Sequence, residues 1–68
     1  MIKFFVEYTD GATFYETDLI SRERAEQIFN EQIEHGNLAN LIQWQSNPKY
    51  PDDEHKGFFK PIYETFKL

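Results

Sequence analysis

The run Asp52-Asp53-Glu54-His55 contains the densest set of side chains that could bind a metal ion or move a proton. Carboxylate oxygens and an imidazole nitrogen are ordinary ligands of divalent cations. However, adjacent residues point in different directions, and the run lacks the glycine-turned spacing of a calcium-binding loop. We therefore interpret it as a solvated charge run, and we predict no metal site and no cofactor.

Few other groups could support nucleophilic or acid–base catalysis. The chain has no cysteine and two histidines, His35 and His55. His35 falls at the end of a predicted helix, where a cation is favourable without any catalytic role. Neither Ser21 nor Ser46 lies in a G-x-S-x-G elbow, and no glycine-rich phosphate loop is present. The sequence therefore predicts no catalytic residues and a protein that is not an enzyme.

Aromatic and acidic side chains remain as the groups most suited to binding. Aromatic residues make up 18% of the 68 residues, and the formal net charge is -5. Nucleic-acid binding depends on Lys and Arg to neutralise phosphates. The 7 basic residues are scattered, so we expect no direct contact with nucleic acid. An acidic surface instead favours a basic partner.

The first element predicted to position these groups is a β-hairpin over residues 2–19. The stretch FFVEYTDGATFYE alternates on both sides of Asp10-Gly11, a pair typical of a two-residue type I′ turn in which both residues have positive φ. In that register one face, the predicted core, carries Ile2, Phe4, Val6, Tyr8, Tyr15, Thr17 and Leu19. The second face carries Lys3, Phe5, Glu7, Phe14, Glu16 and Asp18.

A helix is predicted over residues 22–35. Ser21 is a favourable N-cap and Gly36 a favourable stop. One apolar stripe at helical spacing consists of Ala25, Ile28, Phe29 and Ile33. The acidic residues of this helix, which the pattern predicts to be solvated, are Glu23, Glu26, Glu31 and Glu34.

Residues 39–45 are predicted to form a third strand, because apolar residues alternate there with Gln43 and Gln45. A short helix capped by Asn37 is the alternative, since the leucines of this stretch also fit helical spacing. The composition leaves both assignments open, and we expect the strand.

Residues 46–57 are expected to form a loop, because prolines, a glycine and a charge run exclude regular structure there. Residues 58–67 are expected to form an edge strand, since Pro61 cannot donate to a ladder. The whole chain, 1–68, is then a single domain. Its predicted class is α+β, a two-layer ββαββ fold. The mainly antiparallel sheet has strand order 2-1-3-4, and one helix packs on one face.

The second face of the hairpin raises the question of what surrounds its phenylalanines. The 46–57 loop or the C-terminal segment would cover them if they belong to the core. Left uncovered, they would form an apolar patch rimmed by carboxylates, and such patches mark interaction sites. We predict a protein-contact surface. Its aromatic anchors are Phe5, Phe14 and Trp44, and its charged steering groups are Glu7, Glu16, Glu23, Glu31 and Glu34.

In outline, a hairpin, a helix and a strand in a short acidic chain, the sequence resembles several small phage-encoded proteins that bind host machinery. Inhibitors of host RNA polymerase and of CRISPR complexes have such outlines, and so do small accessory subunits of bacterial RNA polymerase. The resemblance implies a cytoplasmic module that binds or inhibits a larger host protein with a basic surface. The alternative is a homo-oligomeric structural protein, with a homodimer as its simplest form. No apolar run is long enough to span a membrane.

Overall fold

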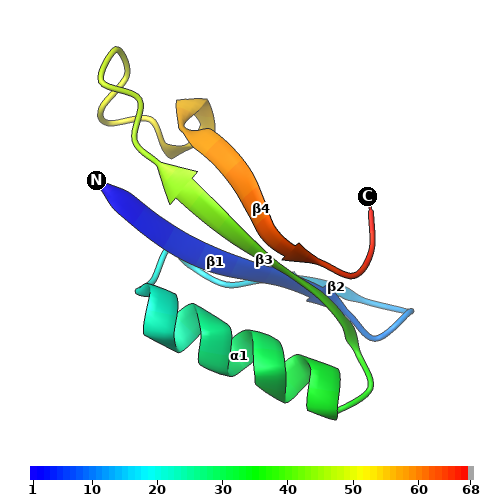
Figure 1. The fold of residues 1–68 in the computed structure, drawn as a ribbon. Coiled ribbons are helices and arrows are strands. Elements are labelled where there is room, and N and C mark those ends of the chain that lie inside the picture. The colour runs from blue at the N-terminus through cyan, green and yellow to red at the C-terminus, as the bar shows by residue number, and fades with distance from the viewer. Residues whose placement is uncertain (68) are drawn as a thin grey trace.

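The computed structural model describes residues 1–67, which form a four-stranded sheet and one α-helix in two layers (Figure 1). The elements are β1 (Ile2–Thr9), β2 (Phe14–Glu16), α1 (Arg22–Glu34), β3 (Leu38–Gln45), the short 3-10 helix η1 (Glu54–Lys56) and β4 (Phe58–Glu64). All neighbouring strands are antiparallel, and their order is β2-β1-β3-β4. The predicted α+β fold with ββαββ order is therefore confirmed.

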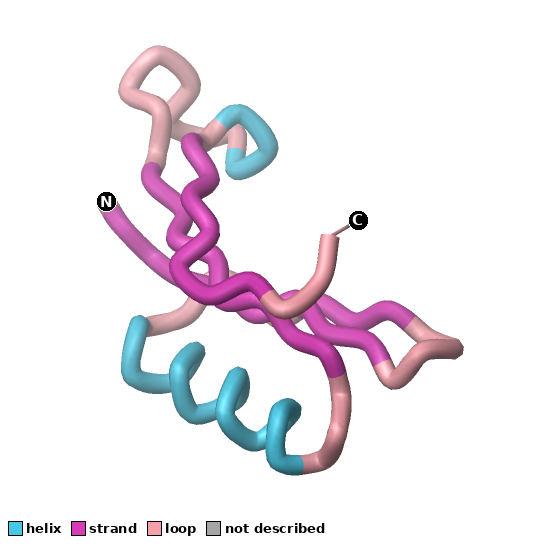
Figure 2. Tube along the Cα trace, turned by 45° about the vertical axis from the view of Figure 1, so that its right-hand side comes forward, coloured by secondary structure: helices cyan, strands magenta, loops and turns pink. Residues whose placement is uncertain are grey.

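The helix α1 packs on β1 and β3, along one side of the sheet (Figure 2). We refer to this side as the helix side and to the opposite side as the second face. The helix-side core consists of Phe4, Val6, Ala25, Ala39 and Leu41. Partly buried side chains packed around it are Tyr8, Ile20, Ile28, Phe29 and Ile62.

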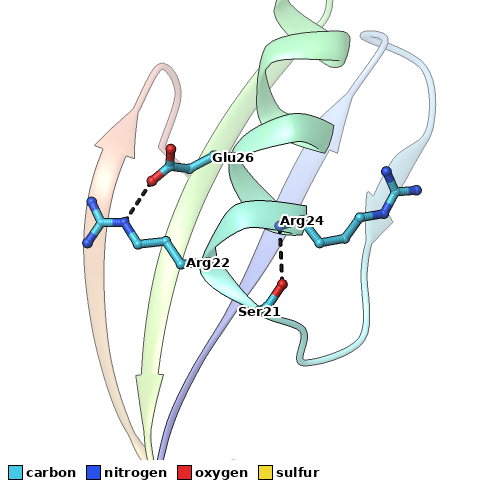
Figure 3. A network of polar contacts seen from close by, with 4 residues as sticks. All are labelled: Ser21, Arg22, Arg24 and Glu26. Carbon is cyan, nitrogen blue, oxygen red and sulfur yellow. Dashed lines mark hydrogen bonds and ion pairs between the residues drawn. The ribbon is translucent and has the colours of Figure 1, made fainter.

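The ends of α1 agree with the prediction to within one residue. The Ser21 hydroxyl accepts a hydrogen bond from the backbone N–H of Arg24 at 3.2 Å, as an N-cap does (Figure 3). At the other end Gly36 has a φ of +82°, and its N–H donates to the Ile33 carbonyl at 3.0 Å. Glycine favours this position because the left-handed conformation costs it nothing sterically.

The turn between β1 and β2 differs from the predicted one. It spans residues 10–13 rather than two residues, and Gly11 has a positive φ whereas Asp10 does not. The Asp10 carboxylate accepts hydrogen bonds from the backbone N–H groups of Ala12 and Thr13, at 2.9 and 2.8 Å. The prediction of a type I′ turn is wrong because this side chain stabilises a longer turn, as Asp often does by bonding to the backbone ahead of it.

The longer turn shifts the pairing by two residues, so side chains keep their predicted faces as far as Glu16, which pairs with Glu7. The predicted hairpin over 2–19 is regular only to this point. Beyond it Phe4 pairs with Ile20, which requires one extra residue on the second strand. An extra residue reverses the alternation. Ile20 therefore joins the helix side, and Leu19, predicted there, packs on the second face instead.

The predicted strand over residues 39–45 is confirmed as β3, and the alternative of a short helix there is wrong. Residues 46–57 form a loop that also contains η1, a turn of regular structure that was not expected. The last strand ends at Glu64 rather than at residue 67. A bulge interrupts its pairing with β3 between Leu41 and Ile42.

The strand β4 is an edge strand, as predicted. Hydrogen bonding alternates from side to side along an antiparallel strand. The backbone of Ala39 bonds to Thr65 on the β4 side, so Ile42, three residues further along, faces β1. Pro61 pairs with Ile42, and its nitrogen therefore faces the free edge, where no ladder bond is lost.

Candidate functional site

The second face contains a buried cluster of its own. Phe5, Ile42 and Trp44 form this cluster, and Leu19 packs against it. Phe5 is 7% exposed and Trp44 is 6% exposed. The expectation that these two rings are exposed anchors is therefore wrong. Leu19 packs against the cluster, Phe59 packs against Phe5, and Trp44 lies under one of two irregular segments that cover this face.

The first of these segments is residues 46–57, here named the loop cover. The indole N–H of Trp44 donates to the backbone carbonyl of Glu54 at 2.9 Å. Gly57 passes so close to the ring that a Cβ there would lie 2.2 Å from Trp44 Nε1. The loop is thus fixed over the indole by a partly buried hydrogen bond and by a glycine that permits the close approach.

The second segment is residues 65–67, here named the C-terminal cover, which curls above the sheet on the side opposite α1 (Figure 1). Asn40, 1% exposed, holds it. The Asn40 Oδ1 atom accepts the N–H groups of Thr65 and Phe66, at 2.8 and 3.2 Å. Its Nδ2 group donates to the Phe66 carbonyl at 2.9 Å and to Glu7 Oε1 at 3.1 Å. All its hydrogen-bonding capacity is used, as burial of an amide requires.

Sequence reasoning missed Asn40. Its position in the sequence could have indicated burial, because it lies two residues before Ile42 and four before Trp44, on the same face of the strand. A neutral polar residue at such a place needs partners. Those partners come from beyond β4, so the local pattern could not identify them.

Two aromatic rings on the second face remain well exposed. Phe14, one of the predicted anchors, is 43% exposed and packs edge-on against Phe66 with ring centroids 6.0 Å apart. Phe59, which sequence reasoning missed, is 53% exposed and packs edge-on against Phe5 at 6.0 Å. Alternation along the predicted edge strand could have indicated it, because side chains of a strand point alternately to the two faces of the sheet.

A cavity of about 320 Å³ opens on the second face, between the segment that follows β2 and the loop cover. Its apolar lining consists of Phe5, Leu19, Trp44 and Phe59. Its charged lining consists of Lys3, Glu16, Asp18 and Glu54, and His55 also lines it. The buried rings form the floor and the exposed charged groups form the rim.

The predicted site residues divide between two sides of the molecule. Glu7, Glu16 and Phe14 lie on the second face, as predicted. The helix carboxylates belong to α1, which packs on the other side of the sheet, and they are solvent-exposed: Glu23, Glu31 and Glu34. One flat partner surface cannot contact both groups at once.

A shallower hollow lies on the helix side, between α1 and β4. Phe29 and Tyr63 line it, with ring centroids 5.6 Å apart. At its border Arg22 Nε donates to Glu26 Oε1 at 2.7 Å, an ion pair drawn in Figure 3. This hydrogen bond raises the pKa of Arg22. The charged lining of the hollow is therefore acidic, with Glu26 paired to Arg22 outside the lining and Glu64 free of a salt bridge within residues 1–67.

No family model matches the chain, and neither a curated protein nor a solved structure matches it. Within residues 1–67 no group of three or more His, Cys, Asp or Glu side chains is placed to hold a metal ion. The one α-helix of that part of the chain is neither long nor apolar enough to cross a membrane. Function is therefore inferred from the second face itself.

Proposed function

We propose that this chain is a non-catalytic, cytoplasmic protein-binding module that docks through its second face on a basic surface of a larger protein. The observation that carries the proposal is the placement of exposed Phe59 and Phe14 among carboxylates on one face. Interfaces are enriched in aromatic residues, and a few such rings supply most of the binding energy.

The carboxylates of this face would set orientation and the rate of encounter. Glu16 and Asp18 are solvent-exposed, and Glu7 is half-buried beside Asn40. Charges at the rim of an interface act mainly through electrostatic steering, which salt screens over roughly 10 Å at 0.1 M ionic strength. Binding is therefore expected to weaken as salt is raised.

Both edges of the sheet carry features that oppose pairing between copies of the chain. β2 is only 3 residues long. β4 has Lys60, Pro61 and a bulge, which are the devices by which edge strands avoid pairing with other chains. We therefore favour docking on a different protein over homo-oligomerisation through a strand edge.

The proposal is tested by affinity capture from a bacterial lysate, followed by titration of this protein with the purified captured protein. The second-face variant is Glu16→Lys with Phe59→Ser. The matched control is Glu31→Lys with Ile33→Ser, which makes the same changes of charge and polarity at exposed positions of α1. Circular dichroism melts establish that each variant is folded, and Glu16→Lys alone replaces the pair if Phe59→Ser unfolds the protein.

The second-face variant is expected to lose at least about tenfold in affinity, since loss of one aromatic anchor commonly costs more than 1 kcal/mol. The control is expected to bind as the unmodified protein does. Retained binding in both variants would contradict the proposal. Equal loss in both would show that net charge, rather than this face, determines binding.

A further inference from the structure

We infer that the cavity on the second face binds one arginine side chain of the docking partner. This inference rests on the proposed function and names the group that the second face recognises. It follows from the size, lining and charge of the cavity.

The size of the cavity limits what it can hold. Its volume of about 320 Å³ lies at the small end of ligand-binding cavities, which span roughly 300–1,000 Å³. It is open on the rim side, where exposed residues line it. One long side chain that enters from a partner surface fits these dimensions better than a large cofactor does.

The apolar lining matches the stem and the planar head of arginine. Phe5 and Trp44 form a buried floor, and half-exposed Phe59 forms a wall. Methylene groups of a long basic side chain pack favourably on such surfaces while the charged head stays at the rim. A guanidinium group also stacks on aromatic rings, which an ammonium group does less readily because it is more strongly hydrated.

The charges at the rim also favour a cation. Glu16, Asp18 and Glu54 supply three carboxylates against the single ammonium of Lys3. In the part of the chain that the structure describes, the one ion pair is Arg22–Glu26, so these carboxylates are free of salt bridges. A carboxylate accepts two parallel hydrogen bonds from a guanidinium, which adds directionality to the attraction.

The lone indole of the chain gives a specific measurement. Trp44 is the only tryptophan, and its N–H, bonded to Glu54, lies beside the cavity. Hexaarginine is titrated into isotope-labelled protein, with hexalysine and hexacitrulline as parallel probes. The Trp44 indole resonance is expected to shift with hexaarginine, to shift at higher concentrations with hexalysine, and to stay unchanged with hexacitrulline.

Two matched variants separate the cavity from net charge. Asp18→Asn is expected to weaken hexaarginine binding about threefold, the effect of one exposed ion pair. Glu31→Gln removes the same charge from the exposed side of α1 and is expected to leave the affinity unchanged. Equal weakening by both variants, or equal affinity for hexalysine and hexaarginine, would overturn the inference.

The same titration distinguishes this inference from the proposed function. Shifts at the amides of Glu7 and Phe14 without a shift of the Trp44 indole would overturn the cavity assignment and leave docking through the second face standing. An absence of shifts with any peptide would also overturn the cavity assignment. The proposed function is then judged separately, by capture with the Glu16→Lys and Phe59→Ser variant.

Discussion

The two faces of the sheet are both covered, but in different ways. On the helix side a regular element supplies the cover, and α1 contributes Ala25, Ile28 and Phe29 through an apolar stripe. On the second face two irregular segments supply it, and each is fixed by a few hydrogen bonds, to Trp44 or to Asn40. The helix side therefore depends on buried area, whereas the two covers of the second face depend on a small number of polar contacts.

This difference has a consequence for local stability. Segments with few buried contacts open at lower free energy than the packed core does. The loop cover and the C-terminal cover are expected to open while α1 stays in place on β1 and β3. The face proposed to bind a partner is thus also the face that can adapt to one.

The largest effect is expected from the helix side. Leu41 is fully buried there, and Leu41→Ala should lower the free energy of unfolding by about 3 kcal/mol, through lost burial and the cavity left behind. Urea unfolding followed by circular dichroism measures this. Leu38→Ala, at a half-exposed position of the same strand, is the control, and we expect a change within about 0.5 kcal/mol. Similar losses in both variants would contradict the assignment of the helix side as the main core.

A smaller effect is expected from the second face. Asn40→Ala leaves backbone groups of Thr65 and Phe66 without their partner and should cost about 2 kcal/mol. In Asn40→Ala the rate of hydrogen exchange should rise much more at the amides of Thr65 and Phe66 than at the amides of α1. Asn30→Ala, at an exposed position of α1, is the matched control. Uniform acceleration across the molecule would mean that the C-terminal cover does not open independently.

The smallest effect on stability is expected from protonation of Asp10 in the β1–β2 turn. This turn lies outside both covers, so it serves as a reference for the two faces. Hydrogen bonds from the backbone N–H groups of Thr13 and Ala12 lower the pKa of Asp10 below its ordinary 3.8. A lowered pKa means that the folded state favours the ionised carboxyl. Its contribution to stability is therefore present above pH 3.8 and is lost as the pH falls through the lower folded-state value.

The pH dependence of the turn is followed by the amide chemical shifts of Ala12 and Thr13. We expect a midpoint below the ordinary carboxyl pKa of 3.8, and loss of this transition in Asp10→Asn. A midpoint at or above that value would indicate that the carboxylate does not accept these bonds in solution.

Local chemistry explains which parts of the fold were predictable. The cap at Ser21, the stop at Gly36 and the alternation along β1 depend on neighbours in the sequence, and each was predicted correctly. The reversal at Leu19 was not predictable, because a single extra residue after Glu16 leaves no distinct composition signal.

The candidate site was predicted only in part, for a related reason. Alternation places Phe14, Glu7 and Glu16 on one face, and the structure has them there. Whether Phe5 and Trp44 were exposed depended on what lies above them, and the loop composition indicated a solvated segment. The loop is fixed by a hydrogen bond to the backbone carbonyl of Glu54 and by the close approach of Gly57, which has no Cβ. Patterns of side-chain type do not reveal either feature.

The strand order also determines when the second face can exist. β1 comes first among the strands but lies inside the sheet, between β2 and β3. Its hairpin with β2 is too small to be stable alone. Pairing Ile2 with Gln45 requires closure of a long chain segment, which is slow and entropically costly, whereas Gln45 and Phe58 are joined by the shorter 46–57 loop. The second face also needs β4 and the C-terminal cover that Asn40 binds. A partner could therefore bind it only after residues 58–67 have emerged from the ribosome.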